Sequence, residues 1–299
     1  MTASEAPAAI AEPRARLDLG RVIGRTFGAI GANFVAFFTL AVLLAALPTF
    51  LIGLGVGYLA PIVYSGASTV TIGLLASSIS FGATMLGMIP TYVLLGALTQ
   101  GCIVYYNGSK ASFGECLAIG FRFLLPLLGV GLLTLLGVFL SVLPIVVINI
   151  FLFALIGAGG IGVLLSTIAF VGAFVPAIVF LIRWSVAAPS LVVERTGVTG
   201  AFRRSRDLTS NNRWAIFFLG LIWVVITLGI QWTINLVRGP ILFGIGGSPG
   251  VGLWLLFGFT ILYSALNALI LAAGQAALYY ELRTSKEGAT SEELAKIFE

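Results

Sequence analysis

Four arginines crowd into the stretch GAFRRSRDLTSNNRW, residues 200–214, of a chain in which charged residues make up only 9%. A guanidinium group binds phosphate through a planar fork of N–H donors, so such a cluster suits the headgroups of anionic lipids. Basic clusters also bind nucleic acid, and basic residues beside apolar spans fix the orientation of a membrane protein. The candidate lipid contacts are Arg203, Arg204, Arg206, Arg213 and Arg183.

Arg183 differs from the other four because apolar residues lie on both sides of it. Its side chain can snorkel to the membrane surface, the interpretation that we favour. Alternatively, it can pair with Glu194 after the chain turns at Pro189.

Uncharged polar residues inside apolar segments form a second candidate set: Gln100, Asn267 and Gln275. Such side chains usually form hydrogen bonds between helices, each worth about 0.6–2 kcal/mol. They can also line a cavity for a lipid or a small neutral solute. We favour the first interpretation and keep the second as the alternative.

Most of the residues and motifs that usually indicate catalysis are missing from the sequence. The chain has no histidine, and we find no GxSxG, HExxH or phosphate-loop motif. Cys102 and Cys116 have neither metal-ligand spacing nor a histidine beside them, so we expect structural thiols, with acylation of Cys116 as the alternative. We therefore predict no catalytic residues, no cofactor and no metal site.

The composition is that of an integral membrane protein. Hydrophobic residues make up 59% of the 299 residues, and the mean hydropathy is +1.11. A membrane-spanning helix needs about 20 mostly apolar residues. The sequence predicts an all-α domain over residues 17–283 between a disordered tail at 1–16 and a C-terminal tail at 284–299. The six predicted spans are residues 34–58, 81–105, 124–148, 162–187, 214–237 and 254–280.

Charge predicts the orientation of these spans. Of the sixteen Lys and Arg residues, all but Arg238 fall on the same side as the N-terminus, together with all eleven acidic residues. The positive-inside rule therefore predicts that both termini are cytoplasmic. The connections on the other side, such as residues 57–73, are uncharged, and we expect them in the membrane interface.

A short amphipathic segment precedes each outgoing span: LDLGRVIGRTFGAIGANF, SFGECLAIGFRFLLP and GVTGAFRRSRDLTSNNRW. Such helices lie at the level of the headgroups, with their apolar side chains in lipid. In the third, we expect Val198, Ala201, Phe202 and Leu208 to face lipid. The pattern indicates three repeats of an interfacial helix followed by a transmembrane hairpin.

Three segments carry a resemblance to a known family: RWSVAAPSLVVERTGVTGAFRRSRDLTSNNRWAIF, SFGECLAIGFRFLLPLLGV and ALYYELRTSKEGATSEELAKIF. Over most of residues 17–299 the chain resembles the membrane region that accompanies some bacterial glycerophosphoryl diester phosphodiesterases, and related six-span inner-membrane proteins. The resemblance implies a six-helix domain without catalysis of its own. The phosphodiesterase activity of the fused proteins belongs to a separate barrel that uses histidines, which this chain lacks.

We therefore expect a noncatalytic scaffold or accessory protein of the bacterial inner membrane, linked to lipid or envelope homeostasis. The alternative is a small transporter or lipid-handling channel for a neutral solute or lipid. The expected partners are membrane lipids, anionic ones included, and a membrane protein or a second copy of the chain. Nucleic acid is not expected, because the basic residues flank apolar spans instead of forming a separate domain.

Overall fold

The computed structural model describes residues 17–64, 68–156, 160–242 and 249–287, and every regular element in these ranges is a helix. The elements are α1 (Leu19–Ala32), α2 (Phe34–Ala41), the π-helical turn η1 (Val42–Ala46), α3 (Leu47–Tyr64), α4 (Thr69–Tyr106), α5 (Phe113–Arg122), α6 (Leu124–Ile156), α7 (Gly160–Arg183), α8 (Ala187–Glu194), α9 (Gly197–Thr209), α10 (Arg213–Leu242) and α11 (Pro249–Glu287). The predicted tail at 1–16 and residues 288–299 of the second tail lie outside the described residues.

Six helical segments are long and apolar enough to cross a membrane: Phe34–Tyr58, Thr71–Tyr106, Leu124–Ile156, Gly160–Glu194, Arg213–Leu236 and Phe257–Glu287. The all-α class with six spans is thus confirmed, and the chain is a multi-pass membrane protein. The first span is interrupted by η1, just before Pro48. Proline lacks the N–H that would bond to the carbonyl of Leu44, so the regular hydrogen-bond ladder cannot continue there.

Several helices run further than the predicted spans. Residues 57–73, expected as an outer connection, mostly belong to α3 and α4, and α11 continues to Glu287. The start of α4 is set by Ser68, whose hydroxyl accepts from the backbone N–H of Thr71 at 3.3 Å. An N-cap of this kind satisfies a free donor of the first turn, so the helix begins well before its most apolar stretch.

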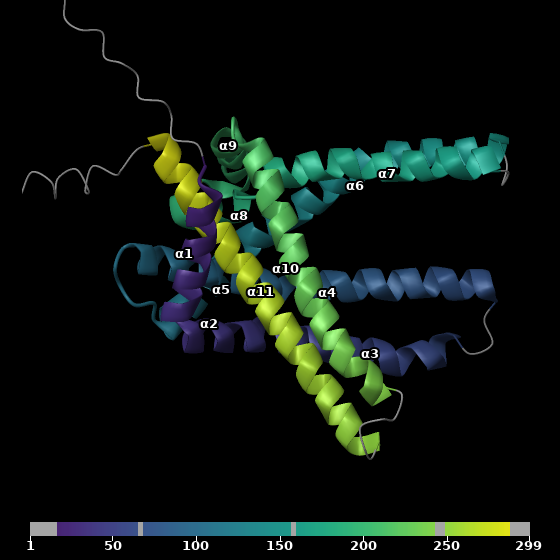
Figure 1. Cartoon of the computed structure of the whole chain (residues 1–299), viewed down its shortest axis with the longest axis horizontal. Helices are drawn as coiled ribbons and strands as arrows, with labels where there is room; N and C mark the ends of the chain where they lie inside the picture. The colour runs from purple at the N-terminus through teal and green to yellow at the C-terminus, as the bar shows by residue number, and fades with distance from the viewer. Residues whose placement is uncertain (1–16, 65–67, 157–159, 243–248, 288–299) are drawn as a thin grey trace, which may run out of the picture.

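The spans form three hairpins, α3 with α4, α6 with α7, and α10 with α11 (Figure 1). The amphipathic helices α1, α5 and α9 lie with α8 and the last turns of α11 at one end, which we call the charged end (Figure 1). An amphipathic helix followed by two spans therefore recurs three times along the chain. That these three units are repeats of one structure stays a prediction.

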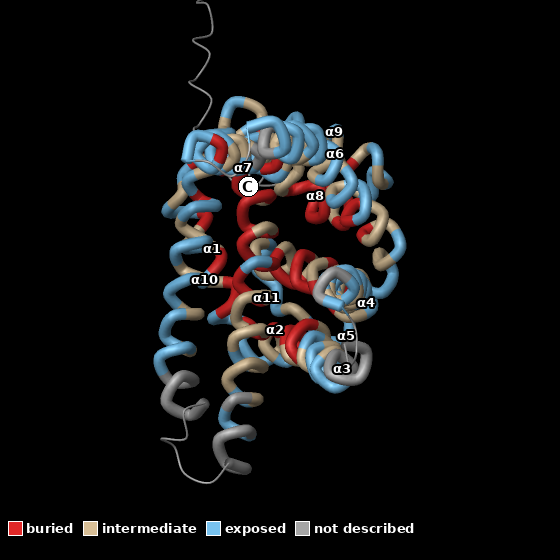
Figure 2. The backbone as a smooth tube through the Cα atoms, turned by 90° about the vertical axis from the view of Figure 1, so that its right-hand side faces the viewer, coloured by how far each residue is buried: buried red, intermediate tan, exposed pale blue. Residues whose placement is uncertain are grey.

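Burial is concentrated towards the charged end. Figure 2 shows the buried residues gathered along α11 and on the helices beside it. Small side chains of α11, including Ala273 and Ala276, pack there against Phe37, Leu40 and Leu98. The outer parts of α6 and α7 expose large apolar side chains such as Phe151 and Leu164. Helices that are apolar all round are expected where lipid is the solvent.

Protein covers much of the apolar face of α9, contrary to prediction. Ala201 and Leu208 are 0% and 1% exposed. Val198 and Phe202, also expected to face lipid, pack against a buried cluster that includes Leu127 and Leu191. The spacing of apolar residues identifies which face of a helix is apolar but does not distinguish burial in protein from burial in lipid. Helix α9 is therefore docked on the spans.

Helix α5 crosses α4 at a glycine pair. A Cβ on Gly96 would lie 3.2 Å from the Cα of Gly120, and a Cβ on Gly120 would overlap the carbonyl oxygen of Val93. Only residues without a side chain permit this approach, which small-residue contacts between membrane helices commonly use.

Gly120→Ala should therefore destabilise the protein. The added methyl group forces α5 away from α4, and overpacking of this kind costs about 1–3 kcal/mol. The measurement is thermal unfolding of the purified protein in a mild detergent. The matched control is Gly114→Ala on the same helix, where a Cβ meets nothing within 4 Å. Equal melting temperatures for the two variants would show that the crossing tolerates a side chain.

Candidate functional site at the charged end

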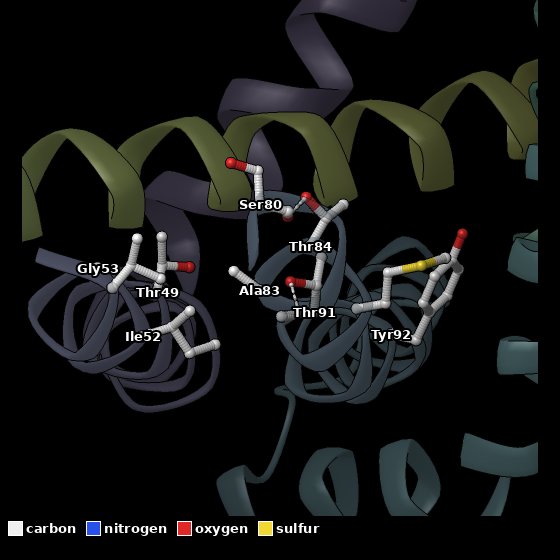
Figure 3. Close-up of a pocket in the computed structure, with 11 residues that line it drawn as sticks. Thr49, Ile52, Gly53, Ser80, Ala83, Thr84, Thr91 and Tyr92 are labelled. Carbon is white, nitrogen blue, oxygen red and sulfur yellow. Dashed lines mark hydrogen bonds between the residues drawn. The ribbon is translucent and has the colours of Figure 1, made fainter. Parts of the chain in front are cut away.

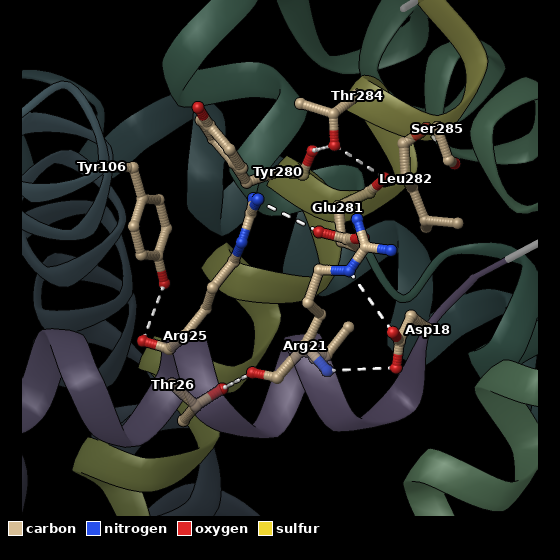
Figure 4. Close-up of polar contacts among 11 residues, drawn as sticks. Asp18, Arg21, Arg25, Thr26, Tyr106, Tyr280, Glu281, Leu282, Thr284 and Ser285 are labelled. Atoms are coloured by element: carbon tan, nitrogen blue, oxygen red, sulfur yellow. Dashed lines mark hydrogen bonds and ion pairs between the residues drawn. The ribbon is translucent and has the colours of Figure 1, made fainter. Parts of the chain in front are cut away.

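A buried carboxylate near the end of α11 joins the last helix to the first (Figure 4). Glu281 is only 3% exposed. Its Oε1 lies 3.5 Å from Nη1 of Arg21, and its Oε2 lies 3.3 Å from Nη1 of Arg25. A buried charge is tolerated when opposite charges compensate for its lost hydration. The two arginines of α1 supply that compensation.

Aromatic rings hold Arg25 in place. Its guanidinium carbon lies 4.5 Å from the ring centroid of Tyr280 and 5.9 Å from that of Tyr106. The Tyr106 hydroxyl also donates to the backbone carbonyl of Arg25 at 3.4 Å. Cation–π contacts of this geometry are worth about 0.5–2 kcal/mol. Arg25 is thus fixed between α4 and α11.

Asp18 caps the N-terminus of α1. Its carboxylate accepts from the backbone N–H of Arg21 at 3.2 Å and pairs with the Arg21 Nε at 3.3 Å. These two hydrogen bonds, the backbone one first, lower the pKa of Asp18 below its ordinary value. The carboxylate is therefore charged at neutral pH.

A second network joins α8, α9 and α11. The Oε1 of Glu194 accepts from the Tyr279 hydroxyl at 2.7 Å and from Nε of Arg204 at 2.8 Å. Arg204 also pairs through Nη2 with Glu287, which in turn binds Arg283 at 2.9 Å. Partial burial lowers the pKa of Arg204, but hydrogen bonds to the two glutamates outweigh it and raise the pKa above its ordinary value. Arg204 is thus a permanent cation used to dock α9.

The predicted arginines therefore separate into different environments. Arg203, Arg206 and Arg213 are exposed, and no ion pair among the described residues involves them. Arg204 is half-buried in the network above. One helix thus carries arginines that bind protein and arginines that are free to bind other molecules.

Arg183 is half-buried, at the end of α7. Its backbone carbonyl accepts from the hydroxyls of Ser205 at 3.0 Å and Thr209 at 3.4 Å. Glu194 pairs with Arg204, and no ion pair in the described part of the chain joins it to Arg183. The pairing of Arg183 with Glu194, the less favoured interpretation of the sequence, is therefore absent from this structure.

The three predicted intramembrane amides do not form one cluster. Gln100 lies on α4, whereas Asn267 and Gln275 lie on α11, and all three are half-buried. Asn267 donates to the Tyr263 hydroxyl at 3.2 Å within its own helix. No hydrogen bond between these amides occurs in the described ranges.

A groove of about 660 Å³ lies between α3 and α4 (Figure 3). Small residues, including Gly53 and Ala83, leave the space open, and hydroxyl groups border it. Two of these hydroxyls are satisfied locally, because Thr84 and Thr91 donate at 2.8 Å to carbonyls four residues earlier on the same helix. The groove thus offers a largely apolar surface within the spans.

The two thiols are buried, as expected of structural cysteines. Cys102 is 0% and Cys116 2% exposed. Burial, together with the charge of Glu115, raises the pKa of Cys116 to about 11. The thiol is protonated at neutral pH and out of reach, which argues against acylation in this conformation. The described residues also contain no group of three or more potential metal ligands.

Glu281, which organises the charged end together with Glu194, was not among the residues predicted from the sequence, and Glu194 was considered only as a partner of Arg183. The segment YYELR placed an acidic residue at the end of an apolar helix, and an acid there signals a partner cation. The sequence could not show which arginine would be that partner.

Comparisons of the chain with protein-family models, with curated proteins and with solved structures give no match. The geometry of the charged end and the chemistry of its side chains therefore carry the functional argument.

Glu281→Gln should lower the stability of the protein. The change leaves Arg21 and Arg25 opposite a neutral amide, and removing one partner of a buried ion pair costs up to about 3–5 kcal/mol. The measurement is thermal unfolding in detergent, with Glu115→Gln, an exposed acid on α5, as the control. If both variants unfolded like the unmodified protein, Glu281 would not anchor α1.

Proposed function

We propose that this chain is a noncatalytic scaffold or accessory protein of a bacterial inner membrane, linked to lipid or envelope homeostasis. Both termini are cytoplasmic, and the charged end lies against anionic lipid headgroups. The observation that carries the proposal is that Arg203, Arg206 and Arg213 are exposed and take part in no ion pair among the described residues.

The distribution of charge supports this orientation. Among the described residues, every Lys and Arg except Arg238 belongs to the helices of the charged end or to the chain directly beside them. Each basic group near an anionic membrane surface contributes about 1 kcal/mol of attraction. The exposed Trp214 follows directly after Arg213, and tryptophan is enriched at membrane surfaces.

The resemblance to the membrane region of glycerophosphoryl diester phosphodiesterases supports the same proposal. It implies a membrane domain that acts without its own catalytic machinery. The absence of histidine from the sequence agrees with a noncatalytic role.

Replacing Arg203, Arg206 and Arg213 together with Gln should weaken binding of phosphatidylglycerol. At about 1 kcal/mol for each charge, the loss is about 3 kcal/mol, or roughly a hundredfold in affinity. The measurement is the binding of fluorescent phosphatidylglycerol to the purified protein in detergent at low salt. The melting temperature should not change, because these side chains form no ion pair within the described chain.

Arg204→Gln is the control, since it removes one positive charge from α9, the helix that carries Arg203 and Arg206. It should lower the melting temperature, because Glu194 and Glu287 lose their partner, and should change lipid affinity much less than the triple variant. If the triple variant bound phosphatidylglycerol like the unmodified protein, the exposed arginines would only set orientation and the headgroup proposal would be wrong.

The groove between α3 and α4 favours one alternative, a lipid-handling channel. Its apolar lining within two spans suits an acyl chain better than a charged solute. A channel of this kind would move fluorescent lipid between the leaflets of reconstituted vesicles, whereas a scaffold would not exceed the rate in protein-free vesicles.

Gly53→Leu distinguishes these functions. A Cβ at Gly53 meets nothing within 4 Å, so a leucine there can extend into the groove. For a channel, this variant should abolish lipid movement, while Gly82→Leu, outside the groove on α4 and equally unobstructed, should not. Movement no faster than in protein-free vesicles for the unmodified protein would instead exclude the channel and favour the scaffold.

A further inference from the structure

A second groove, of about 460 Å³, lies at the charged end beside α1. Gly20, Gly24 and Gly28 line it, and their spacing of four residues places them on one face of the helix. A Cβ on Gly24 would meet nothing within 4 Å, and one on Gly28 would reach only the Tyr105 hydroxyl, at 3.6 Å. The groove is therefore open because these positions lack side chains.

Hydrogen-bond donors border the same groove. Arg21, Arg25, Tyr105 and Tyr106 complete its lining. The Nη1 of Arg25 is buried and has no hydrogen-bond partner in the described part of the chain, although it lies 3.3 Å from Glu281. A guanidinium has five N–H donors. The Nη1 of Arg25 therefore faces Glu281 inside the protein, and only the other N–H groups of Arg25 remain for a ligand in the groove.

The tyrosines of the groove indicate its depth in the membrane. Tyr105 and Tyr106 end the candidate span Thr71–Tyr106, and tyrosine at a span end marks the boundary between hydrocarbon and water. The phosphate groups of membrane lipids occupy this level. A ligand in the groove would therefore meet a phosphate-binding pair of arginines at the height where phosphates are found.

The charges around the groove balance. The two arginines are opposed by two carboxylates, those of Glu281 and Asp18. Asp18 lies beside Gly20, which lines the groove, because the Oδ1 of Asp18 would lie 3.3 Å from a Cβ on Gly20. A site with both signs of charge and no net charge matches a headgroup that also carries both.

We propose that the α1 groove binds the zwitterionic headgroup of one phospholipid, with its phosphate at Arg21 and Arg25 and its ammonium at Asp18. Phosphatidylethanolamine has this chemistry, and its primary ammonium donates hydrogen bonds to a carboxylate. The groove is separate from the exposed arginines of α9, so this proposal does not rest on the anionic-lipid function.

Gly24→Leu tests the site without removing a charge. Leucine fills the groove, and its higher helix propensity should keep or raise the melting temperature. Fluorescent dioleoyl phosphatidylethanolamine and phosphatidylglycerol are titrated into the purified full-length protein in detergent. We expect the unmodified protein to prefer phosphatidylethanolamine and Gly24→Leu to bind it at least tenfold more weakly. Gly31→Leu, on the same helix outside the groove and equally unobstructed, should bind it normally.

Asp18→Asn tests the role of the ammonium. Asparagine caps helices as well as aspartate, so α1 should persist, but the groove gains a net positive charge. Its preference should shift from phosphatidylethanolamine towards phosphatidylglycerol. An unchanged preference in this variant, or normal phosphatidylethanolamine binding by Gly24→Leu, would overturn the proposal.

The triple Gln variant of Arg203, Arg206 and Arg213 separates this site from the α9 surface. It should leave phosphatidylethanolamine binding unchanged. Loss of that binding in the triple variant, with Gly24→Leu unaffected, would instead assign the lipid to α9 and overturn the α1 site.

Discussion

The structure depends on carboxylates that can be buried only beside arginines from other helices. Glu281 of α11 pairs with two arginines of α1. Glu194 of α8 links α9 to α11, because it binds both Arg204 and Tyr279. A buried carboxylate without a cation would be strongly destabilising, so these helices must assemble together. The first and third amphipathic helices are thus fixed to the last span.

This constraint matters because apolar contact alone cannot hold spans together in lipid. Hydrocarbon solvates leucine as well as another helix does, so association relies on close packing and polar contacts. Both are found towards the charged end, where Gly96 meets Gly120 and where the alanines of α11 pack against α2 and α4. Large apolar side chains farther along α6 and α7 remain exposed, consistent with lipid as their solvent. Within the described ranges, these stabilising contacts are thus concentrated towards the charged end.

The sequence was sufficient for the class of the fold, because six long apolar runs can be buried only as membrane spans. It also located α1, α5 and α9 by their helical periodicity. It failed where the answer depended on contacts distant in sequence. Arg25 and Glu281 are 256 positions apart (281 − 25), and no local pattern joins them. The groove beside α1 was missed for a similar reason. Gly24 lines this groove together with Tyr105, which is distant from it in the sequence.

Arg203 and Arg204 show why residue type alone could not define the site. The two are neighbours on one helix and carry the same charge, yet helical geometry points them about 100° apart. Arg204 meets Glu194 and Glu287 and is used to dock the helix, whereas Arg203 is exposed. The acid that happens to lie opposite decides whether an arginine stabilises the protein or remains free for a lipid. A count of positive charges therefore overstates the number of arginines open to a ligand, and the arrangement of the eleven acids is needed to correct it.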